Sequence, residues 1–154
     1  MRGKQAPKRE IAPDPKFNNT TLAKFINYIM QRGKKSVARD IVYDSFDIIE
    51  EKTKQKGLDI FNLAIKNVSP QVEVKARRIG GANYQVPIEV KGNRKFNLAS
   101  RWLLEAAKKR KGMRMCEKLA LELIDASNEQ GDAVKKREDV HRMAESNRAF
   151  AHFA

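Results

Sequence analysis

Lysine and arginine are the residues whose number and spacing indicate a chemistry in this sequence. The chain has 154 residues, with 32 Lys and Arg against 19 Asp and Glu, so its formal net charge is +13. Residues 75–118 contain 13 basic and 3 acidic residues, a net charge of +10, whereas residues 119–154 contain 5 and 7, a net charge of −2. One basic run alone is usually a solvated helix face, but several coincide here. The pattern therefore predicts a surface that binds a polyanion by neutralising its phosphates.

Residue types that carry out catalysis or bind metals are scarce. Cys116 is the single cysteine, and His141 and His152 are the two histidines, so the sequence offers neither an internal disulfide nor a zinc-like ligand set. No histidine can be proposed as the partner of Cys116, and His141 is expected to have a surface or salt-bridged role. Gly80 and Gly81 are turn glycines, because no strand-to-helix transition follows them. We therefore expect no enzyme activity, cofactor or metal.

Two aromatic residues are candidates for stacking on a nucleic-acid base. Trp102 lies on an apolar stripe at helical spacing, as does Cys116, so both are predicted to be buried packing residues. Tyr84 lies beside a turn, and stacking on a base and a structural role are equally good interpretations there.

Helical periodicity predicts three helices before residue 71, over residues 19–33, 36–57 and 59–70. Asn19 or Thr20 can cap the first of these helices, and Ser36 can cap the second. Three more helices are predicted over residues 99–112, over 116–131 and from about residue 135. The inward residues of the second helix are predicted to be Ile41, Ser45, Ile48 and Ile49, and those of the sixth helix Val140, Met143 and Ala144.

Residues 71–91 have the alternation of a β-hairpin, with Gly80, Gly81 and Asn83 in a turn that needs positive φ. The base of the hairpin is expected to pack on the helices and its outer half to contact nucleic acid. At the outer end, Arg77 and Arg78 would be exposed and ready for phosphates. Each strand is predicted to have one apolar face, carrying Val72, Val74 and Ala76 up to Arg78 on the first strand, and Val86, Ile88 and Val90 behind a free Tyr84 on the second.

These elements predict a mainly α fold, a six-helix bundle with an inserted two-stranded β-hairpin arm and a basic extended N-terminus. Residues 1–18 are predicted to be a basic N-terminal arm, the first sixteen of them disordered until bound, 19–147 a single helical domain with the hairpin arm at 71–91, and 148–154 a loose C-terminal tail. No run of consecutive apolar residues exceeds three, so neither a membrane span nor a secretory signal is expected. A soluble, cytoplasmic protein is predicted.

Several distinctive segments are spread over nearly the whole chain: Pro13 to Phe17, Gly33-Lys34-Lys35 with Ile41-Val42 and Ser45, Val72 to Val90, Arg101-Trp102 with Glu105-Ala106-Ala107, and Ala133 to Glu145. Together they resemble the bacterial small-subunit ribosomal protein seven family, nearly end to end. The resemblance implies a protein that binds the 3′ domain of small-subunit ribosomal RNA early and nucleates assembly of the subunit head. It also implies a location near the exit-site tRNA and the messenger RNA path, beside ribosomal protein eleven.

The basic segments and the resemblance together define two sets of candidate contacts. Contacts with ribosomal RNA are predicted for Arg2, Lys4, Lys8, Arg9, Lys16, Arg32, Lys34, Lys35, Lys75, Arg77, Arg94, Lys95, Arg101, Lys108, Lys109, Arg110, Lys111 and Arg114. Positions near tRNA or messenger RNA are predicted for Arg78, Gly80, Gly81, Asn83, Tyr84, Lys136 and Arg142.

Two other classes of function remain as alternatives to a structural RNA-binding protein. A DNA-binding regulator would need a dimer and a recognition helix, and an RNA-modifying enzyme would need an organised pocket. Neither signal is evident in the sequence. No membrane partner and no homo-oligomer are expected.

Overall fold

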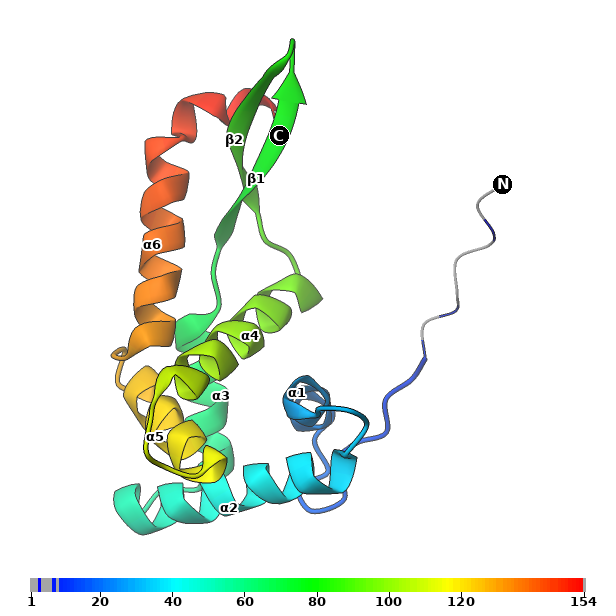
Figure 1. Cartoon of the computed structure of the whole chain (residues 1–154), viewed down its shortest axis with the longest axis vertical. Coiled ribbons are helices and arrows are strands. Elements are labelled where there is room, and N and C mark those ends of the chain that lie inside the picture. Colours follow the sequence, from blue (N-terminus) through cyan, green and yellow to red (C-terminus); the bar gives the residue numbers. More distant parts are fainter. Residues whose placement is uncertain (1–2, 4–6, 8, 154) are drawn as a thin grey trace. The chain divides into compact units, whose positions relative to one another are not determined.

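The computed structural model describes residues 3, 7 and 9–153, and its helices and single hairpin confirm the predicted fold class (Figure 1). The chain divides into two compact units, residues 1–39 and 40–154. No helix in the described residues is long and apolar enough to cross a membrane. The elements are α1 Thr20–Ile29, α2 Lys35–Thr53, α3 Gly57–Val68, β1 Val72–Ile79, β2 Ala82–Glu89, α4 Asn93–Lys109, α5 Met115–Ser127, α6 Asp132–Ser146 and the 3₁₀ helix η1 Arg148–Phe153.

The first unit contains more local order than the sequence predicts. Asp14 is buried, and its carboxylate accepts hydrogen bonds from the backbone N–H groups of Lys16 and Phe17. Such a side-chain turn needs no tertiary partner, because the bonded groups are two and three residues away. The predicted basic arm therefore contains a local turn at residues 14–17, immediately before α1. Asn19 then caps α1, its Oδ1 accepting from the N–H groups of Thr21 and Leu22.

Of the four residues predicted to face inward on α2, Ser45 and Ile49 are buried. The most deeply buried apolar side chains are Val42, Phe46 and Ile49, whereas Ile41 and Ile48 are partly exposed. Ser36 does not cap the helix, because the carbonyl of Lys34 already accepts the N–H of Ala38 and the helix begins at Lys35.

The junction between α2 and α3 is closely packed. Gly57, the first residue of α3, is buried, and a Cβ added there would lie 2.6 Å from the Cβ of Phe46. The ring of Phe46 also packs on that of Phe61 in α3, with 6.0 Å between their centroids.

The core of the second unit lies between α3, α4 and α5, which pack on one another. Trp102 and Cys116 are both buried, as predicted. In α6, Val134 and Ala144 are buried, but Met143 is 51% exposed, so its predicted inward position is wrong. A helix that packs mainly through small side chains such as Ala144 leaves the neighbouring long side chain on its outer side.

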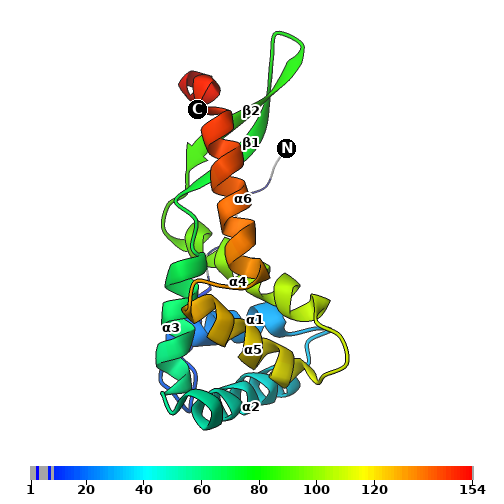
Figure 2. The same ribbon diagram turned by 90° about the vertical axis from the view of Figure 1, so that its left-hand side faces the viewer.

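The hairpin is antiparallel, and α6 runs beside it (Figure 2). Both turn glycines have positive φ, +57° at Gly80 and +90° at Gly81, as the sequence predicts. Asn83 is not part of the turn as predicted, because strand β2 already begins at Ala82 and Asn83 pairs with Arg78. The predicted apolar face of the first strand is wrong. The buried residue of β1 is Glu73, whereas Val72 and Val74 are partly exposed.

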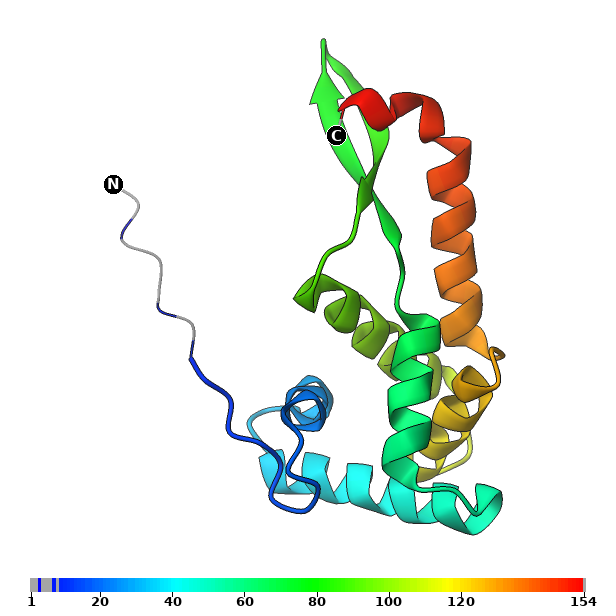
Figure 3. The same ribbon diagram turned by 180° about the vertical axis from the view of Figure 1, so that it is seen from behind.

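The predicted loose tail is instead the 3₁₀ helix η1, which packs against β2 (Figure 3). Its aromatic residues Phe150 and Phe153 lie on the ring of Tyr84. Sequence reasoning missed this helix because its contacts are with the hairpin, more than sixty residues earlier in the chain.

Candidate nucleic-acid interface

A row of cations on α4 is the most regular basic feature of the second unit. Arg94, Arg101 and Lys108 follow one another at intervals of seven residues and are all exposed. Seven residues make nearly two helical turns, so the three side chains share one face, about 10 Å apart at ~1.5 Å per residue. The apolar stripe that includes Trp102 and Leu103 is buried on another side of the helix. Burial of that stripe therefore turns the cations toward solvent.

Arg94 also joins α4 to the base of the hairpin. Its Nε and Nη2 donate to Oε2 of Glu73 at 3.2 and 2.9 Å, and Lys75 lies 3.2 Å from the other carboxylate oxygen. Burial by itself would raise the pKa of Glu73, but the hydrogen bonds from Arg94 and Lys75 outweigh it and hold that pKa below 4.5. This carboxylate stays charged and fixes the start of β1 to the start of α4.

Arg110, a predicted RNA contact, lies within an ion-pair network. Its guanidinium bonds to Glu122, at 2.7 Å from Nη2 to Oε2, and to Asp125. Burial would lower the pKa of Arg110, but the hydrogen bonds to both carboxylates raise it. The side chain of Glu122 is 1% exposed, and its other oxygen accepts the N–H of Ala133 at the beginning of α6. Arg110 therefore joins α4 to α5 and, through Glu122, to α6.

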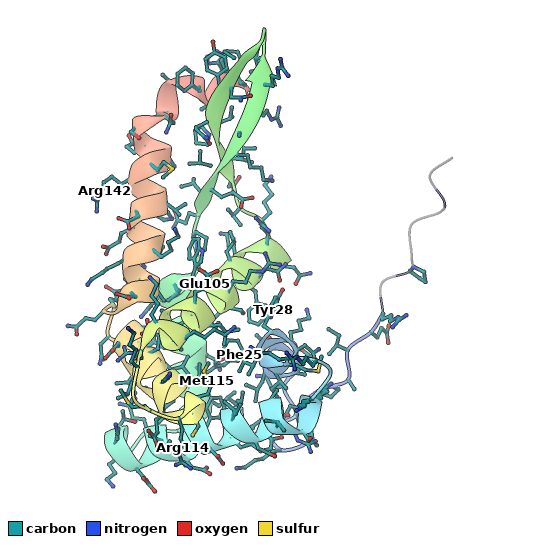
Figure 4. All side chains as sticks on the ribbon, viewed as in Figure 1. Phe25, Tyr28, Glu105, Arg114, Met115 and Arg142 are labelled. Carbon is teal, nitrogen blue, oxygen red and sulfur yellow. The ribbon has the colours of Figure 1, made fainter. Side chains whose placement is uncertain are left out.

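The remaining predicted cations between residues 95 and 114 differ in their exposure to solvent and in their ion pairs. Arg101, Lys108 and Lys111 are exposed and take part in no ion pair within the described residues. Lys109 lies 3.8 Å from Asp132, and Lys95 is partly buried. The hydrogen bond from Arg114 to Glu117 raises the pKa of the exposed arginine. Figure 4 shows Arg114 beside Met115, at the beginning of α5.

The outer half of the hairpin places its predicted residues in two different environments. Arg78, Gly80, Gly81 and Asn83 are exposed. Tyr84 is not free, because its ring lies 5.2 Å from that of Phe150 and 5.6 Å from that of Phe153. Arg77 is exposed, as predicted, but its Nη1 donates to the carbonyl of Phe153 at 2.9 Å, so part of its guanidinium is already bonded within the protein. The difference arises from η1, which packs beside residues that the sequence predicts to be surrounded by solvent.

Two predicted residues of α6, Lys136 and Arg142, are exposed. Arg142 projects from the side of the helix away from the hairpin (Figure 4). His141, one residue earlier, has a structural contact, since its Nε2 accepts the N–H of Gln71 at 3.1 Å. Burial and the charge of Arg137 lower the pKa of His141 from its ordinary value of 6.5, which favours this neutral acceptor.

The predicted cations of residues 1–39 belong to the first unit. Arg9, Lys16, Arg32, Lys34 and Lys35 are exposed. Arg32 has a positive φ of 51° and precedes Gly33, so the basic turn before α2 is sharply bent. Arg2, Lys4 and Lys8 lie outside the described residues.

Sequence reasoning missed the two buried carboxylates that hold this surface together. Glu122 lies between Leu119 and Leu123 on α5, and Glu73 lies between two valines on β1. A charged carboxylate within an apolar stripe is rarely buried without a partner. An acidic residue at such a position could therefore have indicated a buried ion pair with one of the arginines of the chain. Within residues 3, 7 and 9–153, no group of His, Cys, Asp and Glu could hold a metal ion.

Comparison with known proteins gives matches over almost the whole chain. Residues 1–148 match the family model described as ribosomal protein S7p/S5e. Small ribosomal subunit protein uS7 of Polynucleobacter necessarius is 59% identical over 152 residues, which cover 99% of this chain and 97% of the relative. The protein of the same name from a Bradyrhizobium species is 58% identical over 96% of this chain and 95% of the relative. That of Marinobacter nauticus is 56% identical over 99% and 97%.

Proposed function

We propose that this chain, which belongs to the ribosomal protein S7p/S5e family, is a structural component of the small ribosomal subunit that holds ribosomal RNA on α4 and the hairpin. As a ribosomal protein it is not an enzyme, and its partners are ribosomal RNA and other ribosomal proteins in the cytoplasm.

The observation that carries this proposal is the exposed pair Arg101 and Lys108 on α4, seven residues apart and in no ion pair within the described residues, next to Arg94, which is already bonded to Glu73. Long cationic side chains about 10 Å apart on a rigid helix can each meet a different phosphate of a folded RNA. The helix itself is immobilised by its buried stripe and by the Arg110–Glu122 ion pair at its end. Rigid cations lose less conformational entropy on binding than cations on a flexible loop.

The finer proposal is that the protein binds the 3′ domain of small-subunit ribosomal RNA early and so nucleates assembly of the subunit head. The resemblance of the segments described above supports this, and the +10 charge of residues 75–118 supplies the long-range attraction. We further propose that the hairpin and the outer side of α6 lie near the exit-site tRNA and the messenger RNA path, with ribosomal protein eleven as a neighbour.

Binding to separate RNA domains tests the proposal. We expect the protein to bind the isolated 3′ domain much more tightly than the 5′ domain at the same salt concentration. Arg101→Ala combined with Lys108→Ala should lower the affinity for the 3′ domain. Lys52→Ala, at an exposed lysine in the last turn of α2, is the matched control and should change the affinity little. Equal affinity for both domains, or an equal loss with Lys52→Ala, would contradict the proposal.

A further inference from the structure

The register of the hairpin sorts its outer residues into two faces. Arg77 pairs with Tyr84, and Arg78 pairs with Asn83. Directly opposed residues of an antiparallel pair have their side chains on the same face, and neighbours along a strand alternate. Arg77 and Tyr84 therefore share one face of the outer half, and Arg78 and Asn83 share the other.

The C-terminal helix η1 packs on the first of these faces at Tyr84 and bonds Arg77, whose side chain is otherwise exposed. The rings of Phe150 and Phe153 pack on Tyr84, and the carbonyl of Phe153 accepts the hydrogen bond from Arg77. Tyr84 is partly buried as a result, and Val86, two residues along the same face, is fully buried. Aromatic packing of this kind gains free energy from buried area and from the tilted ring arrangement.

The second face is open and polar. Ala76, Arg78, Asn83 and Gln85 are all exposed, and together they offer one guanidinium and two side-chain amides. The turn extends past η1 in both Figure 1 and Figure 2. Apart from each glycine and its chain neighbours, no atom of the described residues lies within 4 Å of a Cβ built at Gly80 or Gly81, so another backbone can approach the turn closely.

We propose that the hairpin contacts RNA with only one face, that of Arg78, Asn83 and Gln85, and that η1 occupies the other through its contacts with Tyr84 and Arg77. This inference rests on the proposed function and specifies how the hairpin contributes to it. The guanidinium of Arg78 suits a phosphate, and the two amides suit the ribose and base edges of an unpaired strand. Arg77, although next in sequence and equally basic, positions the tail.

Cysteine-directed photocrosslinking in assembled small subunits tests this inference. Arg77→Cys and Arg78→Cys are adjacent changes of the same residue type, so each is the matched control of the other. Both are made in a Cys116→Ala background and carry the same photoreactive thiol label. We expect the label at position 78 to crosslink to RNA, with a yield several-fold higher than that of position 77. The label at position 77 should instead crosslink to residues 148–153.

A third variant isolates the role of the tail. Phe150→Ala with Phe153→Ala removes the two rings but leaves the hairpin and α6 unchanged in sequence. In that background we expect the RNA crosslink from position 77 to rise several-fold. Equal RNA crosslinking from 77 and 78 with an intact tail would overturn the inference. So would an absence of RNA crosslinks from 78, or an unchanged yield at 77 without the rings.

Incorporation into the subunit separates the two proposals. If the unlabelled parent protein enters small subunits but the labels show no difference between the faces, the one-sided hairpin is wrong and the proposed function stands. If the parent itself does not enter the subunit, the proposed function fails.

Discussion

Arg110 and Arg101 lie on the same helix and show how one residue type has two roles. Arg110 donates to Glu122 and Asp125 and is half-buried, whereas Arg101 is exposed and has no ion pair within the described residues. The sequence predicts both as RNA contacts. The structure distinguishes an arginine that maintains the helix packing from one that faces solvent.

Arg110→Ala should destabilise the fold and Arg101→Ala should not. Removing Arg110 leaves the buried carboxylate of Glu122 without its partner, at a cost of about 2–3 kcal/mol, below the range of about 3–5 for a fully buried pair because Arg110 is partly exposed. Arg101→Ala should change the free energy of unfolding by less than about 0.5 kcal/mol while lowering RNA affinity. Denaturant unfolding and RNA binding, measured on both variants, check this. Equal destabilisation by the two substitutions would contradict it.

His141 should make stability depend on pH near neutrality. Its pKa is lowered from 6.5 in the folded protein, so as pH falls the unfolded chain takes up the proton first. The contribution of His141 is thus complete above pH 6.5 and is lost as pH falls through that value toward the folded pKa. Protonation removes the acceptor for the N–H of Gln71, so the contact between α6 and the base of the hairpin should loosen.

The measurement compares wild type with His141→Gln, whose side-chain carbonyl accepts a hydrogen bond without titrating. Unfolding free energies from about pH 7 to about pH 5 should fall more steeply for wild type. Glu73, whose pKa is also lowered, loses its contribution mainly below its ordinary value of 4.5, outside this range. Parallel curves for the two proteins would show that His141 does not matter to the pH response.

At the scale of elements, the close approach of α2 and α3 depends on a residue without a side chain. Gly57→Ala would place a Cβ 2.6 Å from the Cβ and 2.9 Å from the Cα of Phe46. Because these atoms belong to the backbone and the root of the side chain, rotating the Phe46 ring cannot relieve the clash. The two helices must separate, at a cost of about 1–3 kcal/mol.

Thermal or denaturant unfolding of Gly57→Ala measures that cost. Lys56→Ala, at the exposed position just before α3, is the control and should change stability by less than about 0.5 kcal/mol. If Gly57→Ala were as stable as the control, the helices would not be packed as closely as the structure shows.

At the scale of the whole molecule, the positive charge of the protein should determine how its affinity for RNA depends on salt. With +10 in residues 75–118, binding to ribosomal RNA should release many counterions. For on the order of 6 to 10 phosphate contacts, affinity should fall by about 10³ or more between about 50 and about 200 mM salt. Filter binding over that range tests this prediction. A flat response would show that phosphate neutralisation is not the main source of affinity.

The sequence by itself determined the helices, the hairpin, its turn and the family. Helical and strand periods are local properties, so residues a few positions apart already show that Trp102 and Cys116 are buried and that Gly80 and Gly81 form the turn. The hairpin and the segment from Ala133 to Glu145 identify the family, because a match between sequences depends on residue order alone.

Only the tertiary structure decided which cations face solvent and which face of the hairpin is open. Arg94 donates a hydrogen bond to Glu73, 21 residues earlier in the chain, and Arg77 donates one to Phe153, 76 residues later. Contacts at such separations depend on how the elements pack, and no local period reports on them. A buried carboxylate and an aromatic tail therefore changed the environment of residues whose own sequence neighbourhood indicated exposed RNA contacts.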